Sequence, residues 1–561
     1  MANLSKQKRE EFITKIEALK QKKAIDDTDK LFLNDIINEL NEKRYGLIWE
    51  KHSETVDEMM INNIPVFTED ADKKIVSEPE LPYNFLLEGD NLHSLKLLEK
   101  THKGKIDVIY IDPPYNTGNK DFVYEDKMIG TDDGYRHSKW LSFMNERLQI
   151  ARDLLSDNGV MFISIDENEF SQLKLLCDSI FNEENIETII WNKVPEYGTA
   201  GSGKMKITYR FRVDHEYILV RYKDKLKTYF DKPLKIPNWK TKYPNKDKDP
   251  RGNWCDGELC KSEEKSNAEG KNYYSITSPS GKTTFTRQWH CTKEEFEQYL
   301  KDTAITEDGK IVSRIWWGSD GEKCPRLKKF QNMPQPTTPT SIIKNISQTD
   351  GNNELKALFG IKTFDNPKPV GLIKELLYMI SNKDAIILDF FAGSGTTVQV
   401  VMELNAEDGG NRKYILCTNN ENNICEDVTY QRLKTVITGI RKDGSKYSDG
   451  IPANLKYYKT DFVSKISKDD DYFTEDKLTQ NIKEMIELEN AVEIDNDKYI
   501  LLLTDEEADT FEQEMKDKNV KKVYIDSTIM LSGKAQSYLD SKQVEVIPIP
   551  DYYFYKDINA G

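Results

Sequence analysis

Hydrophobic residues recur at two different spacings along this chain, and the change of spacing marks its parts. Up to about residue 75 they recur every three or four positions, as at Phe12, Ile16 and Leu19, which predicts amphipathic helices. From about residue 81, short apolar runs such as 106–111 alternate with helical stretches such as 140–155. This alternation predicts a parallel sheet with helices on both faces.

The expected fold class is therefore α/β, with a Rossmann-like core built on a mostly parallel sheet. Strands are expected at 85–87, 106–111, 159–166, 217–220, 385–388 and 414–417. Helices are expected at 92–98, 140–155, 170–181 and 396–404, and the alternation resumes at 372–380 after a long interruption. A segment that interrupts an α/β core and then lets it resume is an inserted domain.

These patterns divide the chain into five parts. A helical region covers 1–75, the first part of the core covers 76–222, and an insert rich in aromatic, Lys, Gly and Pro residues covers 223–348. The second part of the core covers 349–463. The last part, 464–561, is expected to be a small α/β unit with a helix at 478–488, a strand at 499–503 and a strand–helix–strand unit at 520–549.

Composition adds expectations about compartment and partner. The mean hydropathy is −0.69, and no apolar run reaches the roughly 18 residues that a membrane span needs. The start, MANLSKQKREEF, lacks the apolar segment of a secretory signal, and seven scattered cysteines do not form a disulfide framework. We therefore expect a soluble protein of the reducing cytoplasm with no membrane partner.

The net charge of −16 argues against a nucleic-acid partner only on average. Residues 192–251 carry 16 Lys or Arg against 7 Asp or Glu, whereas residues 465–561 carry 12 against 23. The basic segment, which includes Lys206, Arg210 and Arg212, is suited to contact phosphates. A solvated lysine-rich loop is the alternative, and charge alone does not separate the two.

A glycine loop follows the expected strand 385–388 and precedes a helical run. It reads Asp389-Phe390-Phe391-Ala392-Gly393-Ser394-Gly395-Thr396-Thr397. Glycines here let the backbone turn tightly and approach a ligand at the carboxyl edge of a parallel sheet. The third glycine of a dinucleotide fingerprint is missing, so a nucleoside with an amino-acid tail fits better than a pyrophosphate. A plain strand–helix turn is the alternative, which the flanking residues disfavour.

A second strand end, Glu88-Gly89-Asp90-Asn91, carries an acid in a similar position. Asp90 could accept a hydrogen bond from an adenine amino group or from a ribose hydroxyl. The same residues are also common turn chemistry.

The most informative motif is Asp112-Pro113-Pro114-Tyr115, directly after the expected strand 106–111. An exocyclic amine on a base is a poor nucleophile because its lone pair is delocalised into the ring, so an enzyme must orient it. The Asp112 carboxylate and the Pro113 carbonyl can accept from the amine, and prolines make the turn rigid. Tyr115 offers a face for a base flipped out of the duplex. A proline-rich turn is the alternative.

The motif Asp112-Pro113-Pro114-Tyr115 is called the PPY element below. Together with the glycine loop, it predicts methylation of a base amino group by S-adenosylmethionine. The gain would come from orientation and preorganised electrostatics, without a covalent intermediate.

Residues 109–122, 135–144 and 159–166 resemble the modification (Mod) subunits of type III restriction–modification systems. This family consists of β-class DNA adenine-N6 methyltransferases, in which the PPY element precedes the glycine loop. The resemblance covers about residues 45–463. It implies that Asp112, Tyr115 and the Pro113 carbonyl hold a flipped target adenine in double-stranded DNA.

The resemblance also implies a cofactor site. Asp389 would lie beside the methionine moiety, with Phe391, Gly393 and Gly395 in the cofactor loop. The stretch 364–369, Phe-Asp-Asn-Pro-Lys-Pro, is similar to the family's motif X, with Lys368 as its cofactor contact. Many members place an acid after the next strand to hold the ribose. Here that stretch reads Cys417-Thr418-Asn419-Asn420-Glu421-Asn422, which leaves Asn420 or Glu421 as the expected contact.

The insert would be the target-recognition domain, and its DNA contacts are expected among aromatic and basic residues. The candidates are Arg314, Trp316, Trp317 and Lys328, together with Arg210 and Arg212 of the basic segment. Cys255, Cys260, Cys291 and Cys324 near His290 have irregular spacing, so we expect buried thiols and no metal. His137 could position DNA or serve a structural role, and His215 is expected to be structural.

The sequence thus predicts a DNA adenine-N6 methyltransferase that works as a homodimer with a helicase–nuclease restriction subunit. The C-terminal part would serve dimerisation or partner contact. Three alternatives stay open: cytosine-N4 methylation, methylation of RNA or protein, and a non-catalytic DNA-binding specificity subunit. The motif G-x-x-x-x-G-K-[ST] is absent from the chain, so cleavage would belong to a partner.

Overall fold

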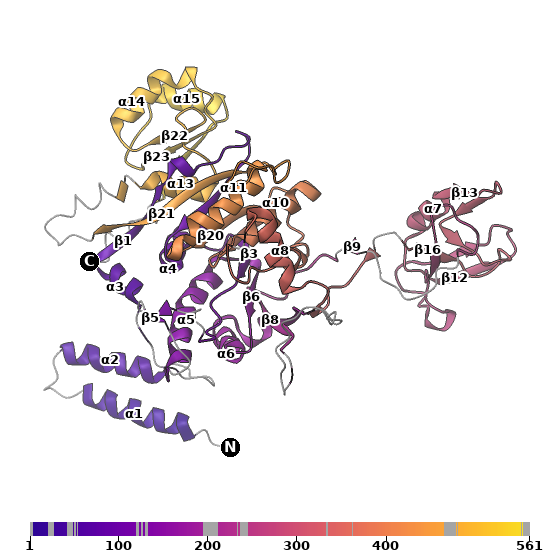
Figure 1. Cartoon of the computed structure of the whole chain (residues 1–561), viewed down its shortest axis with the longest axis horizontal. Helices are drawn as coiled ribbons and strands as arrows, with labels where there is room; N and C mark the ends of the chain where they lie inside the picture. The colour runs from indigo at the N-terminus through magenta and orange to yellow at the C-terminus, as the bar shows by residue number, and fades with distance from the viewer. Residues whose placement is uncertain are drawn as a thin grey trace. The chain divides into compact units, whose positions relative to one another are not determined.

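The computed structural model describes residues 4–20, 27–41, 49, 52, 54–118, 123–124, 127–128, 133–194, 211, 213–232, 234–235, 245–331, 335–361, 363–464, 478–479, 481–550 and 553. Two compact units make up the chain (Figure 1). The first comprises Met1–Phe230 and Thr340–Gly561, and the second is Asp231–Pro339. The second unit falls within the insert, 223–348, that the break in periodicity predicts.

A ten-stranded sheet forms the centre of the first unit, in the order β1-β21-β2-β20-β19-β3-β6-β8-β7-β18. Pairing is parallel from β21 through to β6 and between β7 and β18, and it is antiparallel where β1 and β8 join. In sheet order the strands are β1 (Asn63–Glu69), β21 (Asn454–Ser464), β2 (Tyr83–Glu88), β20 (Lys413–Thr418), β19 (Ile386–Asp389), β3 (Ile106–Ile111), β6 (Leu155–Ile165), β8 (His215–Tyr222), β7 (Ile186–Asn192) and β18 (Ile342–Ile343). The mostly parallel α/β architecture is confirmed.

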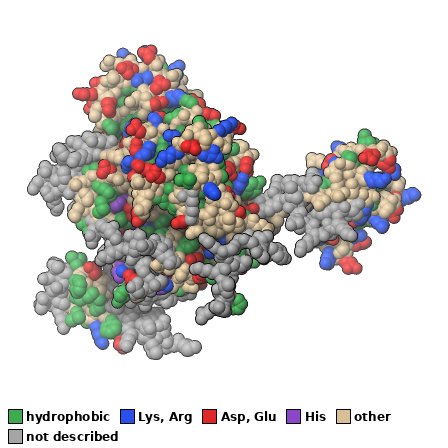
Figure 2. All heavy atoms as spheres, in the orientation of Figure 1, with side chains coloured by type: hydrophobic (Ala, Val, Ile, Leu, Met, Phe, Trp, Pro, Cys, Tyr) green, Lys and Arg blue, Asp and Glu red, His purple; other side chains and the backbone are tan. Residues whose placement is uncertain are grey.

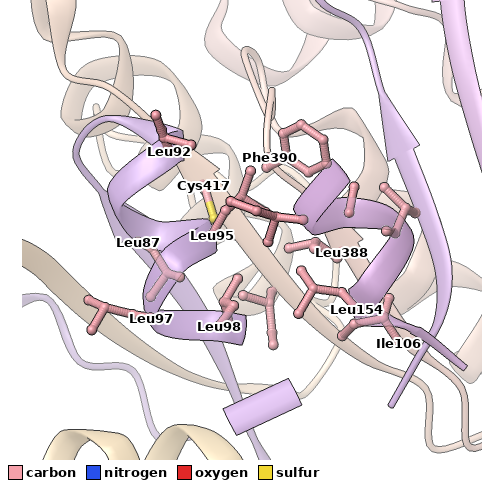
Figure 3. Packing of buried hydrophobic residues seen from close by; sticks show 14 of the residues in the cluster. Leu87, Leu92, Leu95, Leu97, Leu98, Ile106, Leu154, Leu388, Phe390 and Cys417 are labelled. Carbon is pink, nitrogen blue, oxygen red and sulfur yellow. The ribbon is translucent and has the colours of Figure 1, made fainter. Parts of the chain in front are cut away.

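Helices cover both faces of this sheet because strand side chains alternate between faces. Phe85 and Leu87 of β2 belong to one hydrophobic cluster, and Leu86 between them belongs to the other. The first cluster includes residues of α4 (Asn91–His102), α5 (Arg136–Leu154), α6 (Phe170–Phe181) and α13 (Ile482–Asn490). Figure 3 shows part of it, where Leu95 and Leu98 of α4 lie beside Leu388 of β19. The second includes residues of α8 (Gln348–Phe359), α9 (Val370–Leu377), α10 (Thr396–Asp408) and α11 (Tyr430–Thr438).

The N-terminal part is helical only up to residue 62. Helices α1 (Leu4–Lys20), α2 (Asp27–Asn41) and α3 (Thr55–Asn62) are followed by β1, so the expectation of helix through about residue 75 is wrong for 63–69. Ile64, Val66 and Phe67 of β1 are buried, and the whole strand pairs with β21. This pairing joins segments about 400 residues apart, so the strand depends on a partner that local periodicity cannot reveal.

The acidic C-terminal part forms a small parallel sheet with two helices. Strands β22 (Tyr499–Leu502), β23 (Lys522–Ile525) and β24 (Glu545–Pro548) pair in that order, with α14 (Asp505–Glu514) and α15 (Gly533–Ser541) between them. The preceding α13 packs on the central sheet instead. Its buried Glu487 accepts hydrogen bonds from Lys456 Nζ at 2.7 Å and the Tyr458 hydroxyl at 2.6 Å.

The second unit is built from short antiparallel ladders. Its core contains Trp289, Phe296 and Trp317. Its elements are β9 (Leu234–Lys235), β10 (Trp254–Gly257), β11 (Tyr273–Thr277), β12 (Thr284–Gln288), α7 (Lys293–Lys301), β13 (Thr303–Ile305), β14 (Ile311–Ser313), β15 (Ile315–Trp316), β16 (Arg326–Phe330) and β17 (Gln335–Pro336). The remaining ladder, β4 (Val123–Tyr124) with β5 (Lys127–Met128), belongs to the first unit. Over the residues described, no helix has both the length and the apolarity to cross a bilayer.

Candidate active site

The two motifs that carry the expected chemistry follow neighbouring strands. β3 and β19 pair in parallel, with Leu388 opposite Ile109. Asp112–Tyr115 follows β3 and the glycine loop follows β19, so both lie at the carboxyl edge of the sheet. Ligands of open α/β sheets bind at this edge. The pairing of β3 with β19 thus brings together two motifs that lie more than 270 residues apart along the chain.

Asp112 has two carboxylate oxygens in different surroundings. Oδ2 accepts a hydrogen bond from Lys368 Nζ at 2.9 Å. Oδ1 is buried and has no hydrogen-bond partner among the described residues. Burial raises the pKa of Asp112, and the Lys368 ammonium opposes that rise. Asp112 Oδ1 is therefore an acceptor that no hydrogen bond among the described residues occupies.

Tyr115 is held by an acid that no motif marks. Its hydroxyl donates to Glu216 Oε2 at 3.0 Å, and Lys368 Nζ lies 4.9 Å from the centroid of its ring. Glu216 also accepts from Lys193 Nζ at 3.0 Å, and its Oε2 lies 3.6 Å from Lys368 Nζ. Burial pushes the pKa of Glu216 upward, but the two ammonium groups outweigh it and hold that pKa below its usual value.

A second buried acid supports the residue after the PPY element. Asn116 has φ 56° and is fully buried, and its amide donates to Glu169 Oε1. His137 Nδ1 lies 2.7 Å from the same oxygen. Burial raises the pKa of Glu169 to about 8. One peptide before Tyr115, the Pro114 carbonyl accepts from the Trp140 indole at 2.7 Å, so the loop is fixed on both sides.

The glycine loop turns on left-handed backbone and on its own aspartate. Gly393 has φ 50° and Gly395 has φ 73°, values that favour glycine. Asp389 accepts from the Phe391 amide at 3.0 Å and from the Thr397 hydroxyl at 2.6 Å. Burial raises the pKa of Asp389 to about 7. Both Asp389 oxygens therefore serve to shape the loop.

Two residues downstream of β20 also hold the glycine loop. The Thr429 hydroxyl donates to the Gly393 carbonyl at 2.6 Å. The buried Arg432 guanidinium donates to the Ser394 carbonyl at 3.3 Å and to Thr396 Oγ1 at 2.8 Å. Sequence reasoning missed both residues, because no local motif marks them and their partners lie more than 30 positions away.

Several residues expected at the cofactor are engaged inside the protein. Asp90 caps α4 by accepting from the Leu92 amide at 2.7 Å. Asn420 Oδ1 accepts from the amides of Cys425 and Glu426, at the start of a short π-helix. Glu421 is exposed. Lys368, expected at the methionine end, has its ammonium between Asp112 and Glu216. Phe364 lies in the same stretch as Lys368, residues 364–369. Its ring is close to Gly393, because a Cβ atom added to that glycine would lie 3.6 Å from it.

Two expected DNA contacts in the second unit prove to be core residues, which corrects that expectation. Lys328 is fully buried, and its ammonium pairs with Asp247 and Asp249 over the Trp254 ring. Trp317 is 7% exposed and packs in the core of the unit. Lys328 and Phe330 share one face of β16 and both are buried, whereas Arg326, on the same face at the start of the strand, is exposed.

The other expected DNA contacts are placed differently. Trp316 is half-buried against Trp254, with ring centroids 5.4 Å apart. Arg314 pairs with Asp302 at 3.4 Å. Arg210 and Arg212 lie outside the described residues. Within the described part of the chain, no group of three or more His, Cys, Asp or Glu side chains is arranged to hold a metal ion. Cys260 Sγ and Cys324 Sγ lie 3.5 Å apart.

Comparison with known proteins shows which family the chain belongs to. Residues 106–430 match the family model described as DNA methylase. The chain is 34% identical over 390 residues to the type III restriction–modification enzyme StyLTI Mod subunit of Salmonella typhimurium, covering 64% of this chain and 55% of that one. It is 30% identical to the EcoP15I Mod subunit of Escherichia coli, covering 67% and 65%. It is 31% identical to the type II methyltransferase M.KpnI of Klebsiella pneumoniae, covering 67% and 90%.

The chain thus spans between about half and two thirds of the length of these Mod subunits. Among solved structures, it resembles the M1.HpyAVI–SAM complex at 14% identity and a TM-score of 0.29, covering 63% of this chain and 98% of that one. Similarity this low adds nothing to the assignment. The family match covers more than half of the chain and includes both motif loops, and M.KpnI is matched over nine tenths of its length. The chain therefore belongs to the DNA methylase family.

Proposed function

We propose that this protein is a site-specific DNA methyltransferase that transfers a methyl group from S-adenosylmethionine to N6 of adenine. The observation that carries the proposal is the adjacency of the two loops at the carboxyl edges of β3 and β19. It brings a carboxylate with a buried, unpartnered oxygen next to a glycine loop with left-handed backbone. A base amine and a nucleoside cofactor need these two features side by side.

Each side chain has a defined task in this reaction. Asp112 Oδ1 accepts a hydrogen bond from the adenine amine and directs the nitrogen lone pair, and the Tyr115 ring stacks on the flipped base. The glycine loop, which Asp389 shapes through its two hydrogen bonds, forms the cofactor site. Bound S-adenosylmethionine supplies an electrophilic methyl group. Because Lys368 opposes the upward pKa shift of Asp112, it favours the ionised acceptor that this step requires.

Adenine is favoured over cytosine as the target base. The first residue of the motif is Asp112, whereas cytosine-N4 enzymes more often carry serine there. The named relatives at 34% and 30% identity are Mod subunits of type III enzymes, the family whose resemblance implies adenine. The alternative target, N4 of cytosine, would use the same fold and the same loops.

We further propose a role as the modification and recognition subunit of a type III-like system. The second unit, Asp231–Pro339, would read the DNA sequence, and Figure 2 shows Lys and Arg side chains on its visible face among acidic ones. A homodimer would act on double-stranded DNA, and a helicase–nuclease subunit would supply cleavage. Support comes from the named relatives, which are Mod subunits of type III restriction–modification enzymes.

Nucleoside mass spectrometry tests the chemistry directly. The protein is incubated with S-adenosylmethionine and unmethylated mixed-sequence duplex DNA, beside Asp112→Ala. We expect N6-methyladenine with the wild type only, and cofactor affinity within about twofold in the variant because Asp112 lies outside the glycine loop. N4-methylcytosine would overturn the base assignment. Equal activity of wild type and Asp112→Ala would overturn the role of Asp112.

A further inference from the structure

The acid that holds Tyr115 lies on a strand that contributes to neither motif. Glu216 is the second residue of β8 and is 7% exposed. We propose that Glu216 is a positioning residue of the target-base pocket, an inference that rests on the proposed function. It acts through Tyr115 and Lys368, and it deepens the account of the site by adding a residue from the middle of the chain.

The sheet topology explains how Glu216 reaches the active edge. β8 runs antiparallel to β6, and Tyr217 at its beginning lies opposite Ile165 at the end of β6. β6 is parallel to β3. The start of β8 therefore lies at the same edge as the end of β3, where Asp112 and Tyr115 follow. A parallel strand in this position would place its first residues at the opposite edge.

The first action of Glu216 is on the Tyr115 ring. The hydrogen bond of 3.0 Å from the Tyr115 hydroxyl to Glu216 Oε2 fixes the far end of the side chain. The ring is packed against the hydrophobic cluster on one face of the sheet. A stacking surface that is already oriented loses less conformational entropy when the base arrives.

The second action is on the charge of Asp112. Lys368 Nζ lies 2.9 Å from Asp112 Oδ2 and 3.6 Å from Glu216 Oε2, so two carboxylates share this ammonium. Lys193, directly after β7, pairs with Glu216 at 3.0 Å and balances its charge. If Glu216 were uncharged, Lys368 would pair with Asp112 alone and would compete with the base amine for that carboxylate.

The chain offers a comparison for these contacts, at a glutamate that is exposed where Glu216 is buried. Glu187 of β7 accepts from the Tyr222 hydroxyl at 2.7 Å and pairs with Lys225 at 2.8 Å. It lies opposite Val220, near the end of β8. The same Tyr–Glu–Lys arrangement thus occurs at the other edge of the same sheet, away from both motif loops.

The experiment compares Glu216→Gln with Glu187→Gln. Glutamine keeps an acceptor for tyrosine and removes the charge. Methyl transfer from tritiated S-adenosylmethionine to unmethylated genomic DNA gives kcat and KM for DNA, and calorimetry gives the cofactor Kd. We expect Glu216→Gln to lower kcat about 10- to 100-fold, with the cofactor Kd within about twofold of the wild type. Glu187→Gln should leave kcat within about twofold.

The pH profile of kcat is a readout that a structural role would not move. The Glu216 charge contributes to raising the pKa of Asp112, so in Glu216→Gln the acid limb of the profile should move to lower pH. The titratable groups that interact electrostatically with Glu216 or Asp112 are Tyr115, Lys193, Lys368, Tyr110, Asp166 and Asp389, in addition to the effect of these two acids on each other.

Tyr115→Phe provides a second variant in case Glu216→Gln does not fold. It removes the hydroxyl and keeps the ring, and we expect kcat to fall about tenfold with unchanged cofactor Kd. Wild-type kcat in Glu216→Gln, or in Tyr115→Phe if Glu216→Gln does not fold, would overturn the inference while leaving the proposed function intact. A wild-type protein that transfers no methyl group to DNA would overturn the proposed function, and the inference with it.

Discussion

Buried acids around the PPY element differ in charge state, and their neighbours decide which state each adopts. Glu216 faces two ammonium groups, which hold its pKa down. Glu169 faces the Asn116 amide and the His137 ring, and burial raises its pKa to about 8. Burial also lowers the pKa of His137, so a neutral imidazole meets a neutral acid at neutral pH. Glu216 therefore adds a negative charge to the site at neutral pH, whereas the raised pKa of Glu169 favours its uncharged form.

Glu169 should make the folded state sensitive to pH. Its folded pKa lies above its usual value, so the native protein holds this proton more tightly than the unfolded chain. The contribution to stability is complete below about pH 4.5 and is lost as the pH rises through about 8. Glu169→Gln mimics the protonated acid, so we expect it to lose this decline between pH 5 and 8.5.

Urea denaturation followed by tryptophan fluorescence measures the effect at several pH values. The exposed neighbour Glu167 provides the control, because Glu167→Gln should leave the pH slope unchanged. Parallel curves for wild type and Glu169→Gln across this range would contradict the assignment.

At the scale of elements, the glycine loop depends on a helix that follows the next strand. Thr429 and Arg432 come after β20, and their side chains hold the carbonyls of Gly393 and Ser394. A loop whose carbonyls are already bonded keeps its amides and its left-handed glycines in place before a ligand arrives. The loop is therefore built by β19, α10 and α11 together.

Thr429→Val should weaken cofactor binding without changing the shape of the core. Valine replaces the hydroxyl with a methyl group, and the Gly393 carbonyl loses its donor. We expect a loss of about 1–3 kcal/mol in stability and a several-fold rise in the S-adenosylmethionine Kd, measured by calorimetry. Thr438→Val, at the exposed end of the adjoining helix α11, is the control. An unchanged Kd in Thr429→Val would show that the loop is fixed by its other contacts.

At the scale of the whole molecule, the two ends of the second unit are held together by a pair of short strands. β9 and β17 form an antiparallel ladder, with Leu234 opposite Pro336. Of the flanking strands of the first unit, β8 and β18 both pair with β7 in the central sheet. An insert whose two ends meet can be removed without separating the strands on either side.

Replacing 231–339 with a short Gly–Ser linker should therefore separate two activities. We expect cofactor Kd within about twofold of the intact protein, because both motif loops lie in the first unit. Methyl transfer to duplex DNA should fall by at least about 100-fold, because the unit proposed to read the DNA sequence is gone. Calorimetry and the tritium transfer assay measure the two. A folded variant that retains full transfer would contradict the recognition role of this unit.

The sequence alone determined the architecture and the two motif loops. Strand–helix alternation is a local, periodic signal, and it located β3 and α6 residue for residue. Motif loops are short and are recognised by their residue types, so the sequence alone pointed to Asp112, Tyr115 and the glycine loop, and the structure brings these loops to one edge of the sheet. The inserted unit was visible because it breaks the period.

Only the tertiary structure decided which side chains support those loops. Glu216, Thr429 and Arg432 act on partners far away in the chain, so no local pattern marks them. Burial of Lys328 between two carboxylates likewise depends on how the second unit folds, and its position among basic residues suggested the opposite. Periodicity reports what a residue's neighbours along the chain are, whereas pKa, pairing and orientation depend on neighbours in space.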